Sequence, residues 1–73
     1  MKLLVRKATP EAGHVDLEIE EEIAINWDFA EQVIAVGGVH VRSYNELLAV
    51  TEPLKLQGIE QVEVLMLPRM VGG

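Results

Sequence analysis

The stretch 62-VEVLMLPRMVGG-73 decides how the rest of the chain is interpreted. In its first six residues Val62, Val64 and Met66 fall on one side, which is the period-two pattern of a β-strand. Pro68 lacks a backbone N–H and is expected to end that strand. The sequence therefore predicts a strand that leads directly into a short tail ending in two glycines.

Gly72 and Gly73 give this tail a specific chemistry. Glycine has no Cβ, so two consecutive glycines can pass through a narrow channel in conformations closed to other residues. The α-carboxylate of Gly73 has no flanking side chain, and adenylation would let it accept a sulfur or an amine. The alternative is an ordinary frayed terminus. The sequence that precedes the tail is needed to distinguish these two interpretations.

Length and charge limit the class of protein. Seventy-three residues make one domain with a small core. Residues 1–6 lack the apolar stretch of a signal peptide, and no run approaches the length of a membrane span, so we expect a cytoplasmic protein without membrane contact. The net charge of −6 disfavours nucleic acid as a partner and suits a basic protein.

The residue inventory also argues against several kinds of site. The chain has no cysteine, which excludes disulfides, thiolate nucleophiles and thiolate metal sites. Neither His14 nor His40 has a carboxylate at metal-ligand spacing, so no metal site is expected. No catalytic triad pattern or phosphate-binding glycine loop is recognisable. We therefore do not expect an enzyme.

A hairpin is expected at the N-terminal end. Residues 2–8 are expected to form a first strand, with Leu3 and Val5 on one face and Leu4 and Arg6 on the other. Residues 14–20 alternate three aliphatic with three acidic side chains, which predicts a second strand. Proline and glycine in residues 9–13 mark the turn between them. The two strands should pair antiparallel with one apolar face. The acids of residues 16–22 are expected to form the solvated face, rather than a metal site or a docking surface.

A helix is the first of two interpretations of residues 26–42. Asn26 is a good N-cap, and Trp27, Ala30 and Ile34 recur at helical spacing. A left-handed glycine can then end the helix after about ten residues. We predict this helix because it would cover the apolar face of the hairpin. Trp27 would then be the main apolar side chain that packs on the sheet.

A second hairpin is the alternative for the same segment. Residues 33–36 and 39–42 are rich in β-branched side chains, and the two glycines between them can form a two-residue turn. Beyond this segment, Ser43 and Glu46 fit a capping box, which predicts a short helical segment. Pro53 is expected to end it or to start a new turn.

The order of these expected elements resembles a known family, and the closing stretch resembles it most closely. Residues 51–55, Gly58 and residues 62–73 are similar to the closing segment of the bacterial sulfur carriers MoaD and ThiS. In that family a turn leads into a strand and then into a Pro-x-Val-x-Gly-Gly ending. Residues 14–34 also resemble the family's second strand and helix, with Asn26 where a threonine cap is usual.

The resemblance implies a fold. The family has an α+β, ubiquitin-like (β-grasp) architecture, a mixed sheet with one main helix packed on one face. Residues 1–67 would then form the β-grasp domain, and residues 68–73 a flexible C-terminal tail that ends in Gly-Gly.

The resemblance also implies a carrier and not an enzyme. An adenylating activating enzyme would use ATP to form an acyl-adenylate at Gly73, after Gly72, and sulfur would replace AMP to leave a thiocarboxylate. The chain itself would bind no cofactor. A larger synthase subunit would accept the tail, as the large subunit of molybdopterin synthase does in molybdenum cofactor biosynthesis, while in the ThiS branch the sulfur feeds thiazole synthesis. The alternatives are a ubiquitin-like protein modifier and a non-reactive accessory subunit.

An apolar patch is expected on the sheet face opposite the helix. If Val64 and Met66 face the helix, Leu65 and Leu67 must point the other way, as Leu4 does on the first strand. Exposed apolar patches of this kind mark protein contacts. The expected partner-binding residues are Leu4, Leu65, Leu67, Pro68, Arg69, Met70 and Val71.

Overall fold

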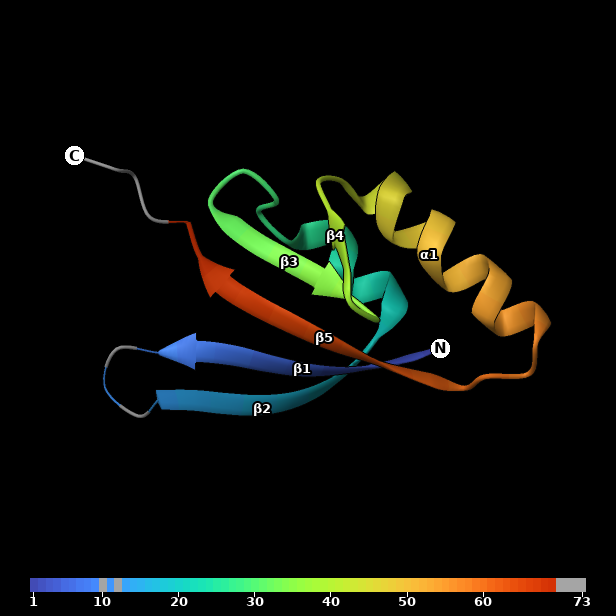
Figure 1. Ribbon diagram of the computed structural model, residues 1–73, viewed down its shortest axis with the longest axis horizontal. Helices are drawn as coiled ribbons and strands as arrows, with labels where there is room; N and C mark the ends of the chain where they lie inside the picture. The colour runs from blue at the N-terminus through green and yellow to red at the C-terminus, as the bar shows by residue number, and fades with distance from the viewer. Residues whose placement is uncertain (10, 12, 70–73) are drawn as a thin grey trace.

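The computed structural model describes residues 1–9, 11 and 13–69 of the chain. Within these residues, five strands form one sheet, and a short 3-10 helix and one α-helix connect them (Figure 1). The elements are β1 (Lys2–Thr9), β2 (Gly13–Glu20), η1 (Glu21–Asn26), β3 (Gln32–Val36), β4 (Val39–Val41), α1 (Tyr44–Leu56) and β5 (Gln61–Pro68).

The sheet is mixed, with strand order β2-β1-β5-β3-β4. Its centre is the parallel pair of β1 and β5, in which Leu3 lies opposite Val62 and Val5 opposite Val64. The other neighbouring strands run antiparallel. This is an α+β fold with one main helix packed on a mixed sheet, consistent with a β-grasp, so the expected fold class is confirmed.

The predicted N-terminal hairpin is confirmed. β1 and β2 pair antiparallel in an unbroken register from Lys2 opposite Glu20 to Thr9 opposite Gly13. Gly13 has a φ of +82°, a conformation that a side chain would disfavour, and so it can end the turn.

The predicted helix over residues 26–36 is wrong, and the hairpin alternative is correct. β3 and β4 pair antiparallel across Gly37 and Gly38, whose φ values of +56° and +85° are those of a type I′ turn. Ile34 is fully buried in β3, opposite Met66 of β5. The β-branched side chains of this segment and its two glycines outweigh the helical spacing.

The segment between η1 and β3 explains why the N-cap signal was misleading. Asn26 ends η1, and it is Asp28 whose carboxylate oxygen Oδ1 accepts the N–H groups of Ala30 and Glu31, both at 3.0 Å. These bonds stabilise one turn and no more. Trp27 is half-buried at the border of the core, tilted against Phe29 with ring centroids 6.3 Å apart, and is not the expected plug on a helix.

The main helix, α1, begins at the predicted capping box but extends further than expected. Ser43 Oγ accepts the N–H of Glu46 at 3.1 Å. Pro53 does not end the helix, because its fixed φ suits a helix and the carbonyl that loses a partner belongs to Ala49 on the exposed side. At the other end Gly58, with a φ of +82°, closes a Schellman motif.

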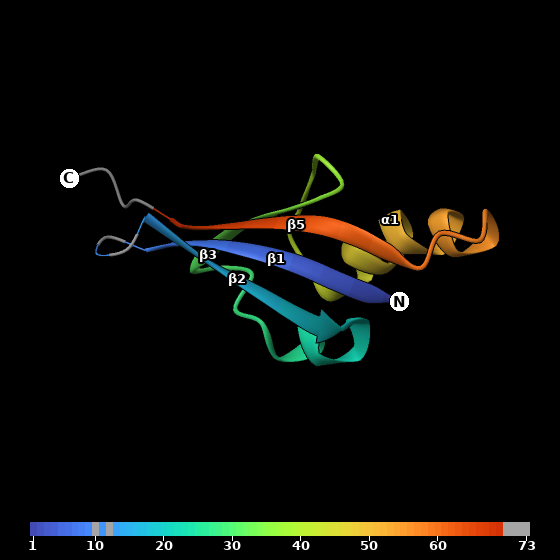
Figure 2. The same ribbon diagram turned by 90° about the horizontal axis from the view of Figure 1, so that it is seen from below.

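Both helical segments cover the same face of the sheet (Figures 1 and 2). Leu47 of α1 and Ala24 of η1 are fully buried in the core, together with side chains from four of the strands. The core residues are Leu3, Val5, Ala24, Ile34, Val36, Val41, Leu47, Val64 and Met66. We call the opposite side of the sheet the open face.

A partly buried ion pair joins η1 to α1. The Glu21 side chain is almost fully buried and accepts a hydrogen bond from Lys55 Nζ. Burial by itself raises the pKa of Glu21, but the hydrogen bonds from Lys55 and Thr51 and the nearby N-terminal ammonium outweigh it, so the pKa lies below its ordinary value. The expectation that residues 16–22 form only a solvated face is therefore wrong at Glu21.

Candidate functional site

The open face presents an apolar patch across the middle strands of the sheet. Leu65 and Leu67 of β5 are 42% and 37% exposed, and Leu4 of β1 lies half-buried on the same face. Ala35 of β3 pairs with Leu65 and widens the patch. We call these residues, Leu4, Ala35, Leu65 and Leu67, the open-face patch. Such a surface is suited to contact with another protein.

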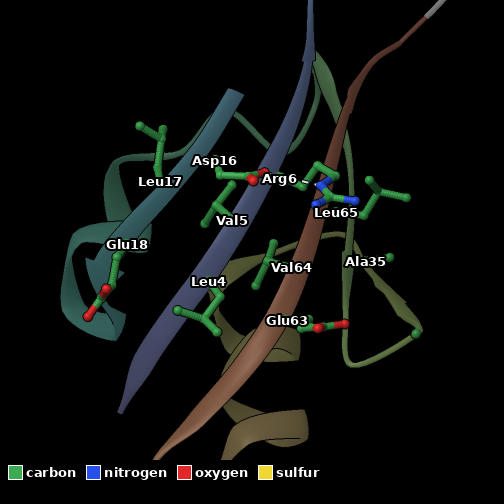
Figure 3. Close-up of a pocket in the computed structure, with 11 residues that line it drawn as sticks. Leu4, Val5, Arg6, Asp16, Leu17, Glu18, Ala35, Glu63, Val64 and Leu65 are labelled. Carbon is green, nitrogen blue, oxygen red and sulfur yellow. Dashed lines mark hydrogen bonds and ion pairs between the residues drawn. The ribbon is translucent and has the colours of Figure 1, made fainter. Parts of the chain in front are cut away.

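A shallow groove of about 670 Å³ runs over part of this patch. Figure 3 shows that side chains from three neighbouring strands meet there, with Leu4 and Arg6 from β1, Glu63 and Leu65 from β5 and Asp16 from β2. The sequence pattern places all of them on one face because strand residues two apart point the same way. The groove is open to solvent and mixes aliphatic with charged walls.

The charges around the groove are arranged in rows across the strands. Arg6 Nε donates to Asp16 Oδ1 at 3.1 Å, and Lys2 Nζ lies 2.8 Å from Glu18 Oε1. The hydrogen bond from Arg6 lowers the pKa of Asp16, so this carboxylate stays charged at neutral pH. Glu63 adds a further negative charge beside Arg6. Carboxylates outnumber cations on this face, which favours a partner with basic groups around an apolar contact.

β5 carries the patch and then leads to the tail. Its last residue, Pro68, pairs with Gln32 at the start of β3, and the N–H of Arg69 donates to the Glu31 carbonyl at 2.9 Å. The chain is thus fixed up to Arg69 at the end of the sheet that also holds the β1–β2 turn (Figure 1). The predicted site residues Met70, Val71, Gly72 and Gly73 lie outside the described residues.

Sequence reasoning missed two surface features. The apolar face expected for the first hairpin is only partly covered, because Val15 and Leu17 of β2 are 42% and 48% exposed. Ile23 and Ile25 of η1 are also exposed. The alternation of apolar and acidic residues in β2 predicts that one face of the strand is apolar. It does not reveal how much of that face a helical segment covers. A ten-residue helix after β2 would have covered more of this face than η1 does.

Among residues 1–9, 11 and 13–69, no three histidine or acidic side chains are grouped so that they could hold a metal ion. No helix in that part of the chain combines the length and apolar character needed to cross a membrane.

Comparison with known proteins gives no relative. The chain matches no protein family model, no curated protein and no solved structure.

Proposed function

We propose that this protein is a small sulfur carrier whose C-terminal carboxylate, on Gly73, is adenylated and then thiocarboxylated. The sulfur then passes to a cofactor precursor, in the manner of the small subunit of molybdopterin synthase. In this proposal the chain carries the reacting group, whereas a separate activating enzyme supplies the ATP site and a larger synthase subunit accepts the tail.

The proposed chemistry takes place at one carboxylate. A Gly73 oxygen attacks the α-phosphorus of ATP, and pyrophosphate leaves. Hydrosulfide delivered by a sulfur donor then attacks the carbonyl carbon of the acyl-adenylate, AMP leaves, and a thiocarboxylate and a proton remain. Two glycines at the end suit a confined active site, because neither has a side chain to meet its walls.

The observation that carries the proposal is the position of β5. This strand lies at the centre of the sheet between β1 and β3, presents Leu65 and Leu67 on the open face, and continues into the tail sequence. A partner that binds the open-face patch therefore holds the strand from which the tail departs. Docking and delivery of the carboxylate would be coupled through a few residues of one rigid strand.

The chain length sets a limit on the partner. Pro68 is the last residue of β5, and an extended chain from there to Gly73 spans at most about 18 Å. The α-phosphate of ATP must therefore bind within that distance of the place where the end of β5 docks. Ordering the tail costs about 1–2 kcal/mol per residue, which backbone hydrogen bonds in the partner have to offset.

Pyrophosphate exchange with an adenylating enzyme from the same host tests this function. Deleting Gly73, or adding one alanine after it, should abolish exchange without changing the melting temperature. The matched control is Glu52→Gln, which should leave exchange unchanged because Glu52 is exposed on α1 and belongs neither to β5 nor to the open-face patch. Undiminished exchange by the extended protein would contradict the proposal.

Intact mass of the protein from its native host gives a second test. A change from carboxylate to thiocarboxylate adds about 16 Da, and so does oxidation of one of the three methionines. Iodoacetamide separates the two, because the chain has no cysteine and only the thiocarboxylate would be alkylated readily. A Gly73–lysine isopeptide in the same extract would instead indicate a protein modifier. An unmodified carboxylate together with no exchange would indicate an accessory subunit.

A further inference from the structure

The two edges of the sheet differ in how they are protected. β4, at one edge, has only three residues and lies beside α1. β2, at the other edge, has eight residues, and all of them except Ile19 are exposed. An edge strand presents a row of backbone N–H and C=O groups that face no neighbour, and it invites pairing unless a proline, a bulge or charged side chains block it.

β2 has no proline and no bulge, and its charged side chains are three acids. Its register with β1 is continuous over all eight positions, so no bulge interrupts it, and its sequence GHVDLEIE contains neither proline nor lysine. The strand is therefore regular enough to accept a second neighbour on its free side. Its side chains then determine which strands can pair with it.

The acids of β2 disfavour pairing with a second copy of β2. Asp16, Glu18 and Glu20 all lie on the open face, because they alternate along the strand. When two copies of β2 pair antiparallel about a two-fold axis, even-numbered residues face even-numbered residues. In the register centred on Leu17, for example, Asp16 would lie opposite Glu18. Like charges directly opposite each other destabilise a strand pair.

We propose that β2 binds an extended segment of another protein as a sixth strand of the sheet, and that this segment alternates lysine or arginine with apolar residues. Its cations would lie beside Asp16, Glu18 and Glu20 on the open face. Its apolar residues would lie beside Val15 and Leu17, which are exposed on the other face. Strand addition supplies affinity through the backbone, and the alternate side chains supply specificity.

The acids of β2 can pair with cations on both neighbouring strands, β1 and the added strand. The ion pairs with β1 use one oxygen each, Asp16 Oδ1 for Arg6 and Glu18 Oε1 for Lys2. The second oxygen of each carboxylate can accept from a cation on the added strand, since an ionised carboxylate has about four acceptor positions. Asp16 and Glu18 would then each lie between two cations, one on β1 and one on the added strand.

A synthetic octapeptide tests the proposal: lysine alternating with valine, acetylated at its N-terminus and amidated at its C-terminus. Titrated into the ¹⁵N-labelled protein, it should shift the amide signals of β2 and slow their exchange with solvent, while the signals of α1 stay in place. The same peptide N-methylated at alternate residues keeps its charge but cannot form the ladder, and it should not bind. Equal binding of the methylated peptide, no binding of either, or shifts confined to the open-face patch would overturn the proposal.

A charge-reversal pair sharpens the test. Glu18→Lys should weaken binding of the lysine–valine peptide about fivefold to tenfold, since an attractive cross-strand pair becomes repulsive. Glu52→Lys on α1 makes the same change of charge away from β2 and should leave the affinity within about twofold. Equal losses in both variants, or a concentration-dependent dimer formed through β2 without peptide, would contradict the proposal. Deleting Gly73 should leave peptide binding unchanged, so this result is independent of the proposed sulfur-carrier function.

Discussion

The two faces of the sheet differ sharply although the same strands form both. Along β5, Val64 is 2% exposed and its neighbour Leu65 is 42% exposed. Along β1, Leu3 is fully buried, whereas Leu4 on the other side is reached by solvent. Since successive residues of a strand point to opposite faces, one residue position separates the core from the surface.

Alternate residues of a single strand therefore have different roles, one set in stability and the other in recognition. Side chains of the covered face contact α1, η1 and one another, so changing them alters the free energy of unfolding. Side chains of the open face touch few partners within the chain, so changing them alters what the protein can bind. Neighbouring residues therefore make matched pairs of substitutions.

The largest expected effect is that of Val64→Asp. This substitution places a charge without a partner in the core, which costs several kcal/mol. A domain of 73 residues has only about 4–11 kcal/mol of total stability, so the variant should be unfolded at 25 °C. Circular dichroism and the chemical-shift dispersion of NMR spectra would measure this. Leu65→Asp, one residue away on the open face, should stay folded and lose binding to the activating partner. If both variants unfold, or neither does, the two faces are not distinct in the way described.

The next effect is pH-dependent and concerns Glu21. Its pKa in the folded protein lies below its value of about 4.5 in the unfolded chain, so its contribution to stability is fully present above that pH and is lost as the pH falls through the folded pKa. Glu21→Gln should therefore be less stable than the wild type at pH 7, and the gap should narrow as the pH falls below about 4.5. Urea unfolding at several pH values measures the gap.

The control for Glu21 is Glu22→Gln, its exposed neighbour in η1. This variant should follow the wild-type stability curve at every pH. A gap between Glu21→Gln and the wild type that stays constant with pH would show that the stabilisation by Glu21 does not come from its charge.

A smaller effect is expected at the β3–β4 turn. Gly37→Ala and Gly38→Ala both force a side chain into a positive φ, at a cost of about 1 kcal/mol each. The new Cβ at Gly37 would also lie 3.3 Å from a Val62 methyl group, while that at Gly38 meets no atom within 4 Å. Thermal unfolding should therefore rank Gly37→Ala below Gly38→Ala. Equal melting temperatures would mean that the Val62 side chain moves away without cost.

The smallest effect on stability is expected for Arg6→Gln. The ion pair of Arg6 with Asp16 is exposed, and such pairs contribute little to folding. The melting temperature should not change measurably, whereas the salt dependence of partner binding should. A clear loss of stability would assign Arg6 a role in the fold and weaken the interpretation of the open face as a recognition surface.

The sequence predicted the parts of the fold that depend on alternation alone. Val64 and Leu3 follow period two without interruption, and the sheet places them in the core as expected. The helix predicted after β2 was wrong because Trp27 and Ile34 have a helical spacing by coincidence. The two glycines of the turn determine that the backbone forms a hairpin there. Local spacing could not reveal that α1, more than thirty residues after β1 in the sequence, supplies the main cover of the sheet.

The partly buried ion pair could not be predicted either. Glu21 belongs to a run of acids that otherwise lie on the surface, and its partner Lys55 comes from the far end of α1. Only the path of the chain brings the two together. The open-face residues Leu4, Leu65 and Leu67 were placed correctly because they depend only on parity along two strands.

The parallel pair of β1 and β5 has a consequence for how the protein folds. The first strand of the chain acquires its central neighbour only when β5, the last strand described, joins the sheet. Contacts this distant in sequence slow folding, because the loop between them has to close before they form. On the ribosome, β1 and β2 can form a hairpin early, but the sheet stays divided in two until β5 has been synthesised. The strand proposed to deliver the tail is thus also the one that completes the fold, so a chain truncated before β5 loses both.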